Sequence, residues 1–478
     1  MSMKRYIKNI LMLSFAVLCL AGCEKFFTQY PTNSVTKNNF YQTDDDFNQA
    51  VRGCYARLKS NMSFHLTALA YRGDECIQTA MTTSNQNQYY LDRFEENPSC
   101  AIMSDIWNSW YSGIYRCNDV LNQIEGKEIT NAAKYKAEAL FLRSWFYFTL
   151  YRCFGVVPLT TVVVTPEEAV LVPRCTKEQM LQRLEEDLNF CIENLPKTRN
   201  EEVARVTTIA AQALLGKVYL TFGMYPEAEQ VLADAMEDPE YGLMPTTADV
   251  FDVKNKMNKE IIFALYYNKT NDHGHSFWWD STSESTDRTN PTQNLRDLYD
   301  KDADNRLSLI RDWIQLEKSE VYTEDRYVLK KWYDNYDQVY IEQVGNDFPH
   351  LRYADVVLMM AEALAMQDRI AEAHTYMNMT RQRAGLISLD LTNISDKDAF
   401  IKELANERGR EFALEGQRWF DLVRLGLAIN HFKNLVVDYK GRVIKYDNIS
   451  EKNLVFPIPN DQIEIVNNPQ ILWQNPGF

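Results

Sequence analysis

The chain has 478 residues and a formal net charge of −15 at pH 7. A negative balance of this size disfavours nucleic acids and anionic membrane faces as partners, because both would repel the protein, and it fits neutral ligands better. The length is enough for a large hydrophobic core and allows two or three domains.

The N-terminus has the pattern of an exported lipoprotein. Three basic residues precede a mostly apolar run, residues 10–20, and the tetrad Leu-Ala-Gly-Cys then ends at Cys23. A basic segment, a short apolar segment and small residues before a cleavage point are typical of a signal peptide, and this run is too short to span a bilayer. The tetrad resembles a bacterial lipobox, which implies that residues 1–22 are removed and that Cys23 carries acyl chains. Two or more acyl chains give stable membrane anchoring.

Seven further cysteines lie in the N-terminal half of the chain. An odd number cannot form a closed set of disulfides, and the spacings contain no Cys-x-x-Cys and no zinc-binding pattern. We therefore expect most of them to be small core residues. They are Cys54, Cys76, Cys100, Cys117, Cys153, Cys175 and Cys191.

The dominant period after Thr43 is helical. Apolar residues recur at three- and four-residue spacing, which predicts amphipathic or buried helices over most of the chain. The predicted helices are Asp45–Lys59, Ile106–Ile124, Ala132–Cys153, Lys177–Asn194, Thr207–Phe222, Glu227–Ala235, Arg352–Met366, Ile370–Ala384 and Ala399–Leu414. The sequence therefore predicts a mostly α-helical protein.

Two segments resemble tetratricopeptide helix–turn–helix units. In Thr207–Ala228 an apolar helix is followed by Gly223 and Tyr225 at the turn, and in Met359–Met377 alanines stand where paired helices approach closely. We expect such hairpins to form a helical scaffold. Ordinary helical hairpins without true repeats would give the same pattern and remain an alternative.

The remaining segments are short strands and long polar stretches. Ile261–Tyr267 and Tyr327–Trp332 read as strands. Three long polar stretches accompany these strands. The first, Thr82–Asn97, precedes both strands, the second, Asn268–Gln293, lies between them, and the third, Asn335–Pro349, follows them. Loops of this length in a compact chain are usually functional or disordered. We expect these loops and strands to carry the binding face of the protein.

Aromatic side chains occur in or beside these polar stretches. The C–H face of a sugar ring packs on aromatic planes, while its hydroxyl groups need polar side chains nearby. We predict that the two adjacent tryptophans form the main stacking platform, whereas Trp332 is a weaker candidate because its strand could turn it towards the core. Burial in the core is the alternative for every one of these aromatics. The candidate ligand-binding residues are Trp278, Trp279, Tyr89, Tyr90, Arg93, Trp332 and Tyr336.

The segment from Glu403 to Gly426 concentrates charge in what looks like a buried corner. If the helix continues to Glu415, three glutamates recur at i, i+4 spacing, Arg408 can pair with Glu411, and Gly416 supplies a left-handed stop. We expect these charges to form an internal ion network. Its predicted members are Glu407, Arg408, Glu411, Glu415 and Arg418.

Enzymatic and metal sites find little support. The chain contains no phosphate-binding loop, no nucleophile elbow and no zinc-protease motif. A glycoside hydrolase using Glu411 and Glu415 is the best enzymatic alternative, but neighbours on one helix face cannot flank a sugar from both sides. Arg408, Arg410 and Arg418 would also hold these acids ionised. Asp300-x-Asp302-x-Asp304 begins like a calcium loop but lacks the required glycine and glutamate. We expect no catalysis, no cofactor and no metal.

The charged segment resembles a known family. An Arg/Glu-rich helix followed by Gly-x-Arg-Trp-x-Asp-Leu-x-Arg-x-Gly, residues 416–426, is similar to the C-terminal signature of the SusD/RagB family of outer-membrane nutrient-binding lipoproteins. Family-like motifs also occur in the family's order over nearly the whole mature chain. They include residues 39–41, 138–143, 154–159, 172–174, 258–263, 352–356, 381–385 and 474–478.

The resemblance implies a tetratricopeptide-like helical scaffold and a lipid-anchored position on the cell surface. It also implies that the protein captures an oligosaccharide and passes it to a TonB-dependent, SusC-like outer-membrane transporter, without catalysis. We predict a signal peptide at 1–22, an N-terminal helical region at 23–235 and a C-terminal region at 236–478. A helical-repeat lipoprotein that binds peptides or scaffolds other surface proteins is the alternative function.

Overall fold

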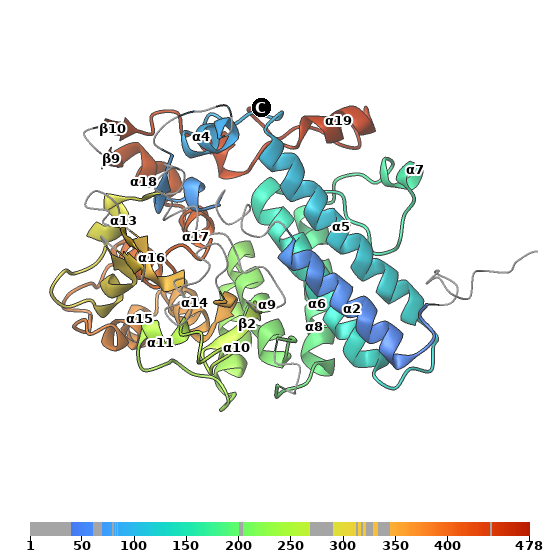
Figure 1. The fold of residues 1–478 in the computed structure, drawn as a ribbon, viewed down its shortest axis with the longest axis horizontal. Coiled ribbons are helices and arrows are strands. Elements are labelled where there is room, and N and C mark those ends of the chain that lie inside the picture. Colours follow the sequence, from blue (N-terminus) through green and yellow to red (C-terminus); the bar gives the residue numbers. More distant parts are fainter. Residues whose placement is uncertain are drawn as a thin grey trace, which may run out of the picture.

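The computed structural model describes residues 40–60, 69–78, 81, 83, 85–199, 204–267, 290–311, 314–316, 319–321, 328–332, 345–439 and 442–478. The protein is mostly helical (Figure 1). The α-helices are α2 (Asp44–Lys59), α4 (Gln86–Asp92), α5 (Ala101–Ile124), α6 (Ala132–Phe154), α7 (Pro166–Ala169), α8 (Lys177–Asn194), α9 (Thr208–Phe222), α10 (Tyr225–Met236), α11 (Thr247–Val250), α13 (Gln293–Asp297), α14 (Tyr353–Met366), α15 (Ile370–Arg383), α16 (Lys397–Glu411), α17 (Arg418–Arg424), α18 (Ala428–Asn434) and α19 (Asn460–Val466).

The N-terminal half is built from long helices that lie side by side, with α2 against α5 and α6, and α6 against α8 (Figure 1). Helix α6 occupies the centre of this layer, and from Ala137 to Leu150 every residue is buried. Close packing of α5 on α6 depends on Gly113, since a Cβ atom there would lie 2.5 Å from the ring of Phe146. The apolar character of α6 on all sides therefore follows from its central position.

The two predicted helical hairpins are present. Helix α9 packs on α10, and α14 packs on α15. At the first hairpin Gly223 caps α9 in the left-handed conformation, with φ 81°. Gly216 lets the two helices approach closely, because a Cβ atom there would lie 2.6 Å from Leu232. Small residues at helix contacts, which the sequence suggested, thus have a steric function.

Short antiparallel strand pairs join the helices. The central pair is β2 (Ile261–Leu265) with β8 (Phe348–Arg352), in which all ten residues are buried. The predicted strand Tyr327–Trp332 is wrong in its second half, because β7 ends at Leu329 and residues Lys330–Trp332 form a 3-10 turn. The other strands are β1 (Cys76–Ile77), β3 (Asn290–Pro291), β4 (Ile310–Arg311), β5 (Ile314–Leu316), β6 (Ser319–Val321), β7 (Val328–Leu329), β9 (Val436–Tyr439) and β10 (Arg442–Lys445).

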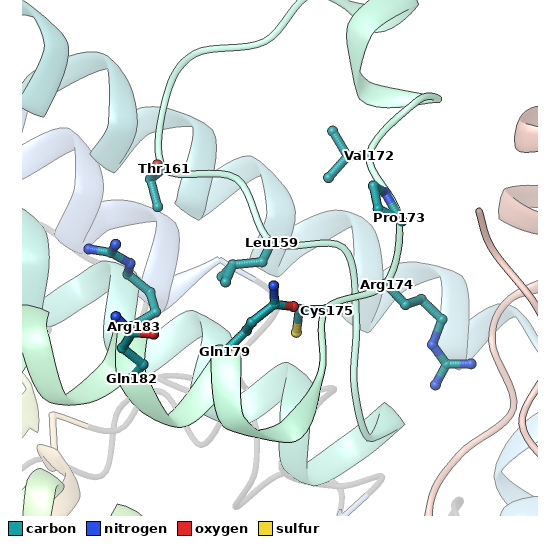
Figure 2. A pocket seen from close by; sticks show the side chains of 9 residues that line it. All are labelled: Leu159, Thr161, Val172, Pro173, Arg174, Cys175, Gln179, Gln182 and Arg183. Carbon is teal, nitrogen blue, oxygen red and sulfur yellow. The ribbon is translucent and has the colours of Figure 1, made fainter. Parts of the chain in front are cut away.

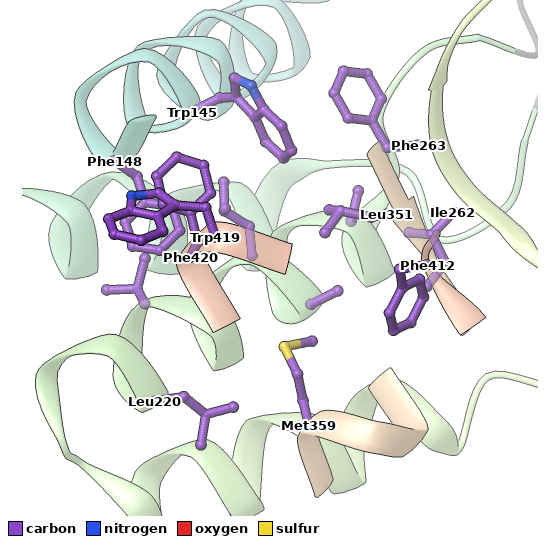
Figure 3. Close-up of a cluster of buried hydrophobic side chains, with 14 of the residues drawn as sticks. Trp145, Phe148, Leu220, Ile262, Phe263, Leu351, Met359, Phe412, Trp419 and Phe420 are labelled. Carbon is purple, nitrogen blue, oxygen red and sulfur yellow. The ribbon is translucent and has the colours of Figure 1, made fainter. Parts of the chain in front are cut away.

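One hydrophobic core joins the N-terminal helices to the C-terminal half. Figure 3 shows Trp145 of α6 directed towards Phe263 of β2, with Met359 of α14 and Trp419 of α17 in the same cluster. The rings of Trp145 and Phe263 meet edge to face at 5.6 Å, a favoured geometry for aromatic pairs. The seven cysteines from Cys54 to Cys191 are all buried, as expected. Within the described part of the chain, no helix is long and apolar enough to cross a membrane.

Candidate functional site

Helix α4 brings together three of the predicted ligand-binding residues. Tyr89 and Tyr90 lie on its last turn, with ring centroids 6.3 Å apart, and Arg93 caps its C-terminal end. The guanidinium of Arg93 lies 5.2 Å from the centre of the Tyr89 ring. Tyr89 and Tyr90 are half-buried, and the side chain of Arg93 is 11% exposed. The arrangement offers aromatic surface and a planar hydrogen-bond donor at one place, which suits a polyhydroxylated ligand.

Polar contacts hold the side chains of this group in position. Arg93 donates to the carbonyl oxygen of Gln78 at 2.9 Å and pairs with the carboxylate of Asp92, Nη1 to Oδ2, at 3.0 Å. Gln86 donates to the Tyr90 hydroxyl at 3.0 Å. Burial raises the pKa of Asp92 to about 7, although Arg93 opposes this shift. Arg93 is therefore neutralised by a neighbour when Asp92 is ionised, and the group does not present a strong excess of positive charge.

Helix α4 and its C-terminal end rest on a rigid aromatic base formed by Phe94, Trp419, Phe432 and Tyr446. Phe94 contacts the other three rings at centroid distances of 5.8, 4.9 and 5.9 Å. Arg72 lies 4.3 Å from the centre of the Phe94 ring. In Figure 1 α4 lies at the upper edge of the molecule, on the side of β9, β10 and α18. Arg93 lies 5.8 Å from the centre of the Tyr446 ring, so this buried base holds the C-terminal end of α4 in place, which limits the entropy lost when a ligand binds.

The other predicted ligand-binding residues have different outcomes. Trp332 is wrong as a ligand contact because its side chain is 0% exposed. It packs between Phe251 and Phe348, with centroid distances of 5.2 and 5.1 Å. The 3-10 turn directs the Trp332 side chain into the core. Burial in the core was the alternative for this residue in the sequence. Trp278, Trp279 and Tyr336 lie outside the described residues, as does Cys23.

The predicted ion network is buried, and its centre is Glu411. The carboxylate of Glu411 lies 2.5 Å from Arg383, 2.9 Å from Arg352 and 3.1 Å from Arg306. Burial would raise the pKa of Glu411, but these three guanidinium groups together hold it well below its ordinary value. A carboxyl group held ionised and away from solvent cannot act as a general acid.

The neighbouring glutamates are paired in the same way. Glu407 accepts from Arg306 at 2.8 Å and from Arg410 at 2.9 Å, and Glu415 accepts from Lys331 and, at 2.8 Å, from Arg352. Arg306 and Arg352 therefore each bridge two of these three glutamates. The three glutamates that recur at i, i+4 spacing in the sequence thus all belong to one buried charged cluster.

Two details of the sequence prediction are wrong. Helix α16 ends at Glu411 and not at Glu415, and Leu414 already has φ 61° before Gly416 at φ 73°. The side chain of Arg408 does not pair with Glu411 but with two aspartates on other helices, discussed below. Glu411 instead pairs with arginines that are more distant in the sequence. Their guanidinium groups are desolvated, and they therefore require carboxylates in the same buried space.

The sequence analysis did not identify these long-range partners. Arg418 pairs with Asp74, Nε to Oδ1, at 2.8 Å, and Asp74 lies more than three hundred residues earlier in the chain. Arg306 was also missed. Arg352 and Arg383 did occur in segments that resemble family motifs, and this was the available signal. Spacing alone identifies neighbours on one helix, whereas the partners here come from separate elements.

A calcium site at residues 300–304 is also inconsistent with the geometry. The carboxylate of Asp304 is bound by Arg306, with Nη2 2.8 Å from Oδ2. The carboxylate of Asp300 accepts backbone hydrogen bonds from Asp302 and Ala303. These contacts explain the acidic run as a capped turn before a 3-10 helix, η2 (Asn305–Leu309).

A hollow of about 290 Å³ lies between α8 and the segment that precedes it (Figure 2). Leu159, Val172 and Pro173 form its apolar side, and Gln179 and Arg183 of α8 line the polar side. Arg183 is already paired with Glu186 and Asp187. In Figure 2 Arg174 points away from the hollow. The volume is at the lower limit for small-molecule sites, so this hollow is a weaker candidate than the α4 group.

The fold and the α4 group define a class of protein: a helical scaffold that presents aromatic and polar side chains on one short helix at its surface. Two family models match the chain. The SusD family model matches residues 279–478, and a model described as "Starch-binding associating with outer membrane" matches residues 25–220. Together the matches cover more than half of the sequence. The chain belongs to the SusD/RagB family.

Individual relatives agree with this assignment. A SusD-like protein from Formosa agariphila is 24% identical, and the alignment covers 98% of this chain and 98% of the relative. The solved structure of a SusD-like protein from Bacteroides fragilis has a TM-score of 0.80 at 23% identity, covering 94% of this chain and 100% of that chain. A laminarin-binding SusD-like protein has a TM-score of 0.75 at 24% identity, covering 91% and 100%. These structures share the fold of this protein.

Proposed function

We propose that this protein is a lipid-anchored protein of the outer-membrane surface that binds a neutral oligosaccharide. In this proposal it delivers the bound glycan to a TonB-dependent transporter in the same membrane. Family membership, the starch-binding description of one family model and the laminarin-binding relative all support a carbohydrate ligand. The lipobox-like tetrad before Cys23 supports the anchor.

The observation that carries the proposal is the group of Tyr89, Tyr90 and Arg93 on α4. Aromatic rings that stay half-exposed on a rigid base can stack on the C–H faces of sugar rings. Arg93 can donate hydrogen bonds to hydroxyl groups while Asp92 balances its charge. We also assign Trp278 and Trp279 to this binding surface, because a segment so poor in aliphatic residues offers little to bury two indoles against.

Binding without catalysis is part of the proposal. The carboxylates of Glu407, Glu411 and Glu415 are buried, and the pKa of Glu407 and of Glu411 is lowered. For both residues burial acts in the opposite direction and is outweighed by the arginines. The hydrolase alternative would need one of these groups to be accessible and protonated near neutral pH. Detectable glycan hydrolysis by the purified protein would restore that alternative.

The anchor can be tested by the substitution Cys23→Ala. We expect the variant to incorporate no labelled fatty acid and to leave the membrane fraction, because only the acylated cysteine holds it there. The measurement is fractionation with metabolic lipid labelling in cells that lack the cognate transporter. The matched control is Cys54→Ala, which removes a buried thiol and leaves the tetrad intact. Retention of Cys23→Ala in the membrane pellet would contradict the prediction.

The α4 group can be tested by Tyr89→Ala and Tyr90→Ala. A glycan array first selects the best ligand, with laminarin and starch oligosaccharides included. We expect each substitution to weaken binding about thirtyfold, corresponding to about 2 kcal/mol, as for a central aromatic at a binding site. Calorimetry gives the affinity, and a thermal melt confirms the fold.

Tyr115→Ala is the matched control, because Tyr115 is an exposed tyrosine on α5 (43% exposed). We expect it to leave the affinity unchanged. Equal affinity in all three variants would remove the α4 group from the site. An array with no glycan hits would favour the alternative function, binding of peptides or other surface proteins on the helical scaffold.

A further inference from the structure

One tryptophan in the C-terminal segment is exposed. Trp473 shows 41% of its surface to solvent, whereas Leu472 before it is buried. The five other tryptophans among the described residues are all buried. The contribution of burial to stability grows with the apolar area that is buried, and the indole of tryptophan is the largest side chain. The indole of Trp473 is instead held in a folded segment with part of its surface accessible to a ligand.

A guanidinium group lies against this indole. The Cζ atom of Arg174 is 4.7 Å from the ring centroid of Trp473. Arg174 is itself buried, and it donates to the carbonyl oxygens of Val156 at 2.7 Å and Trp473 at 2.8 Å and to Oδ1 of Asn475 at 2.7 Å. The cation is thus immobilised by contacts to two segments of the chain, one at Val156 and one at residues 473–475. It supports the ring of Trp473 from the protein side.

The backbone on either side of Trp473 is fixed as well. The backbone N–H of Arg174 donates to the carbonyl oxygen of Ile471 at 3.1 Å. The side-chain amide of Asn475 donates to the carbonyl oxygens of Phe154 and Phe456 at 2.9 and 2.7 Å. The segment is therefore joined to the end of α6 and to the core. A ring that is already immobilised loses little conformational freedom when it is covered by a ligand.

We propose that Trp473 is a second carbohydrate contact, a stacking site for one neutral pyranose ring that is separate from the α4 group. A guanidinium behind the ring makes its outer surface a poor site for another cation. The net charge of −15 disfavours an anionic ligand. The exposed side chain of Gln470, in the same segment, offers hydrogen bonds to hydroxyl groups. This inference rests on the proposed function only in one respect, which is the choice of glycans as probes.

The test is fluorine NMR of the mature Cys23→Ala protein labelled with 5-fluorotryptophan. The chain has nine tryptophans, and the resonance that disappears in Trp473→Phe belongs to Trp473. The probes are laminarihexaose and maltohexaose. We expect at least one of them to shift this resonance, and to do so also in a protein that carries both Tyr89→Ala and Tyr90→Ala. We expect Trp473→Ala to weaken binding at this second site at least tenfold.

Ile387→Ala is the matched control, because Ile387 is an apolar side chain that is 85% exposed in another part of the molecule. It should change neither resonance nor affinity. If both oligosaccharides bind the α4 group but leave the Trp473 resonance in place, this inference fails and the proposed function stands. A resonance that moves only when the transporter is added would identify a protein interface instead. Absence of binding at both places would overturn both proposals.

Discussion

Replacing Glu411 by Gln is expected to destabilise the protein more than any other single change in the charged cluster. The substitution keeps the size of the side chain but leaves Arg306, Arg352 and Arg383 with one carboxylate fewer in a buried space. Removal of one member of a buried ion pair costs about 3–5 kcal/mol. Three arginines share this carboxylate, so we expect a loss at the upper end of this range, measured by urea unfolding.

The control for this experiment is Glu372→Gln. Glu372 pairs with Arg369 at 2.5 Å, but the two side chains are 56% and 39% exposed. Exposed ion pairs contribute little because water screens the charges and the long side chains lose freedom. We expect the urea midpoint of this variant to stay close to that of the unchanged protein. Equal effects of the two substitutions would show that the Glu411 cluster is hydrated in solution.

The same cluster predicts a pH dependence. The pKa of Glu411 is lower in the folded protein than its ordinary value of 4.5, so the unfolded chain takes up the proton first as the pH falls. The contribution of Glu411 is therefore complete at neutral pH, and it declines below about pH 4.5. Glu407 has the same direction of shift. We expect Glu411→Gln to lose less stability than the unchanged protein between pH 5 and pH 3.

Helical periodicity predicted most of the scaffold from the sequence. Helix α8 has the predicted bounds, Lys177–Asn194, because Thr176 caps its N-terminus with a complete capping box. Helix α5 begins five residues earlier than the predicted Ile106, at Ala101. The segment that leads into it, around Cys100, has no side-chain capping bond that would mark the start. A local capping box thus marks the start of α8 in the sequence, whereas the start of α5 carries no such signal.

The candidate site was less predictable than the fold. Tyr89, Tyr90 and Arg93 were predicted in a polar loop, and the short helix α4 that brings them together was not predicted. The aromatic base beneath them combines Phe94 with residues of the C-terminal region, and no local pattern reveals such a contact. Trp332 shows the opposite case: a tryptophan beside a polar stretch is buried because a 3-10 turn redirects it. Side-chain direction in irregular segments depends on packing between distant parts of the chain.

Replacing Arg408 by Ala is the second substitution with a large expected effect. Its guanidinium joins two helices to α16: Nη2 lies 2.9 Å from Asp355 of α14 and Nε lies 2.8 Å from Asp421 of α17. All three side chains are buried. Burial would raise the pKa of both aspartates, but Lys217 and Arg408 outweigh this for Asp355, and Arg408 and Arg424 do so for Asp421. The substitution therefore leaves two buried carboxylates underpaired.

We expect Arg408→Ala to cost about 3–5 kcal/mol in urea unfolding, because a buried ion pair loses its shared member. Each aspartate keeps one cation, since Lys217 lies 2.5 Å from Asp355 and Arg424 lies 3.0 Å from Asp421. The effect should consequently be smaller than that of Glu411→Gln. Adding Asp421→Asn to Arg408→Ala removes one underpaired charge and should restore part of the stability. The control is Arg369→Ala, which removes an exposed ion pair and should change the stability little. A double variant less stable than the sum of both single changes would contradict a direct pairing between Arg408 and Asp421.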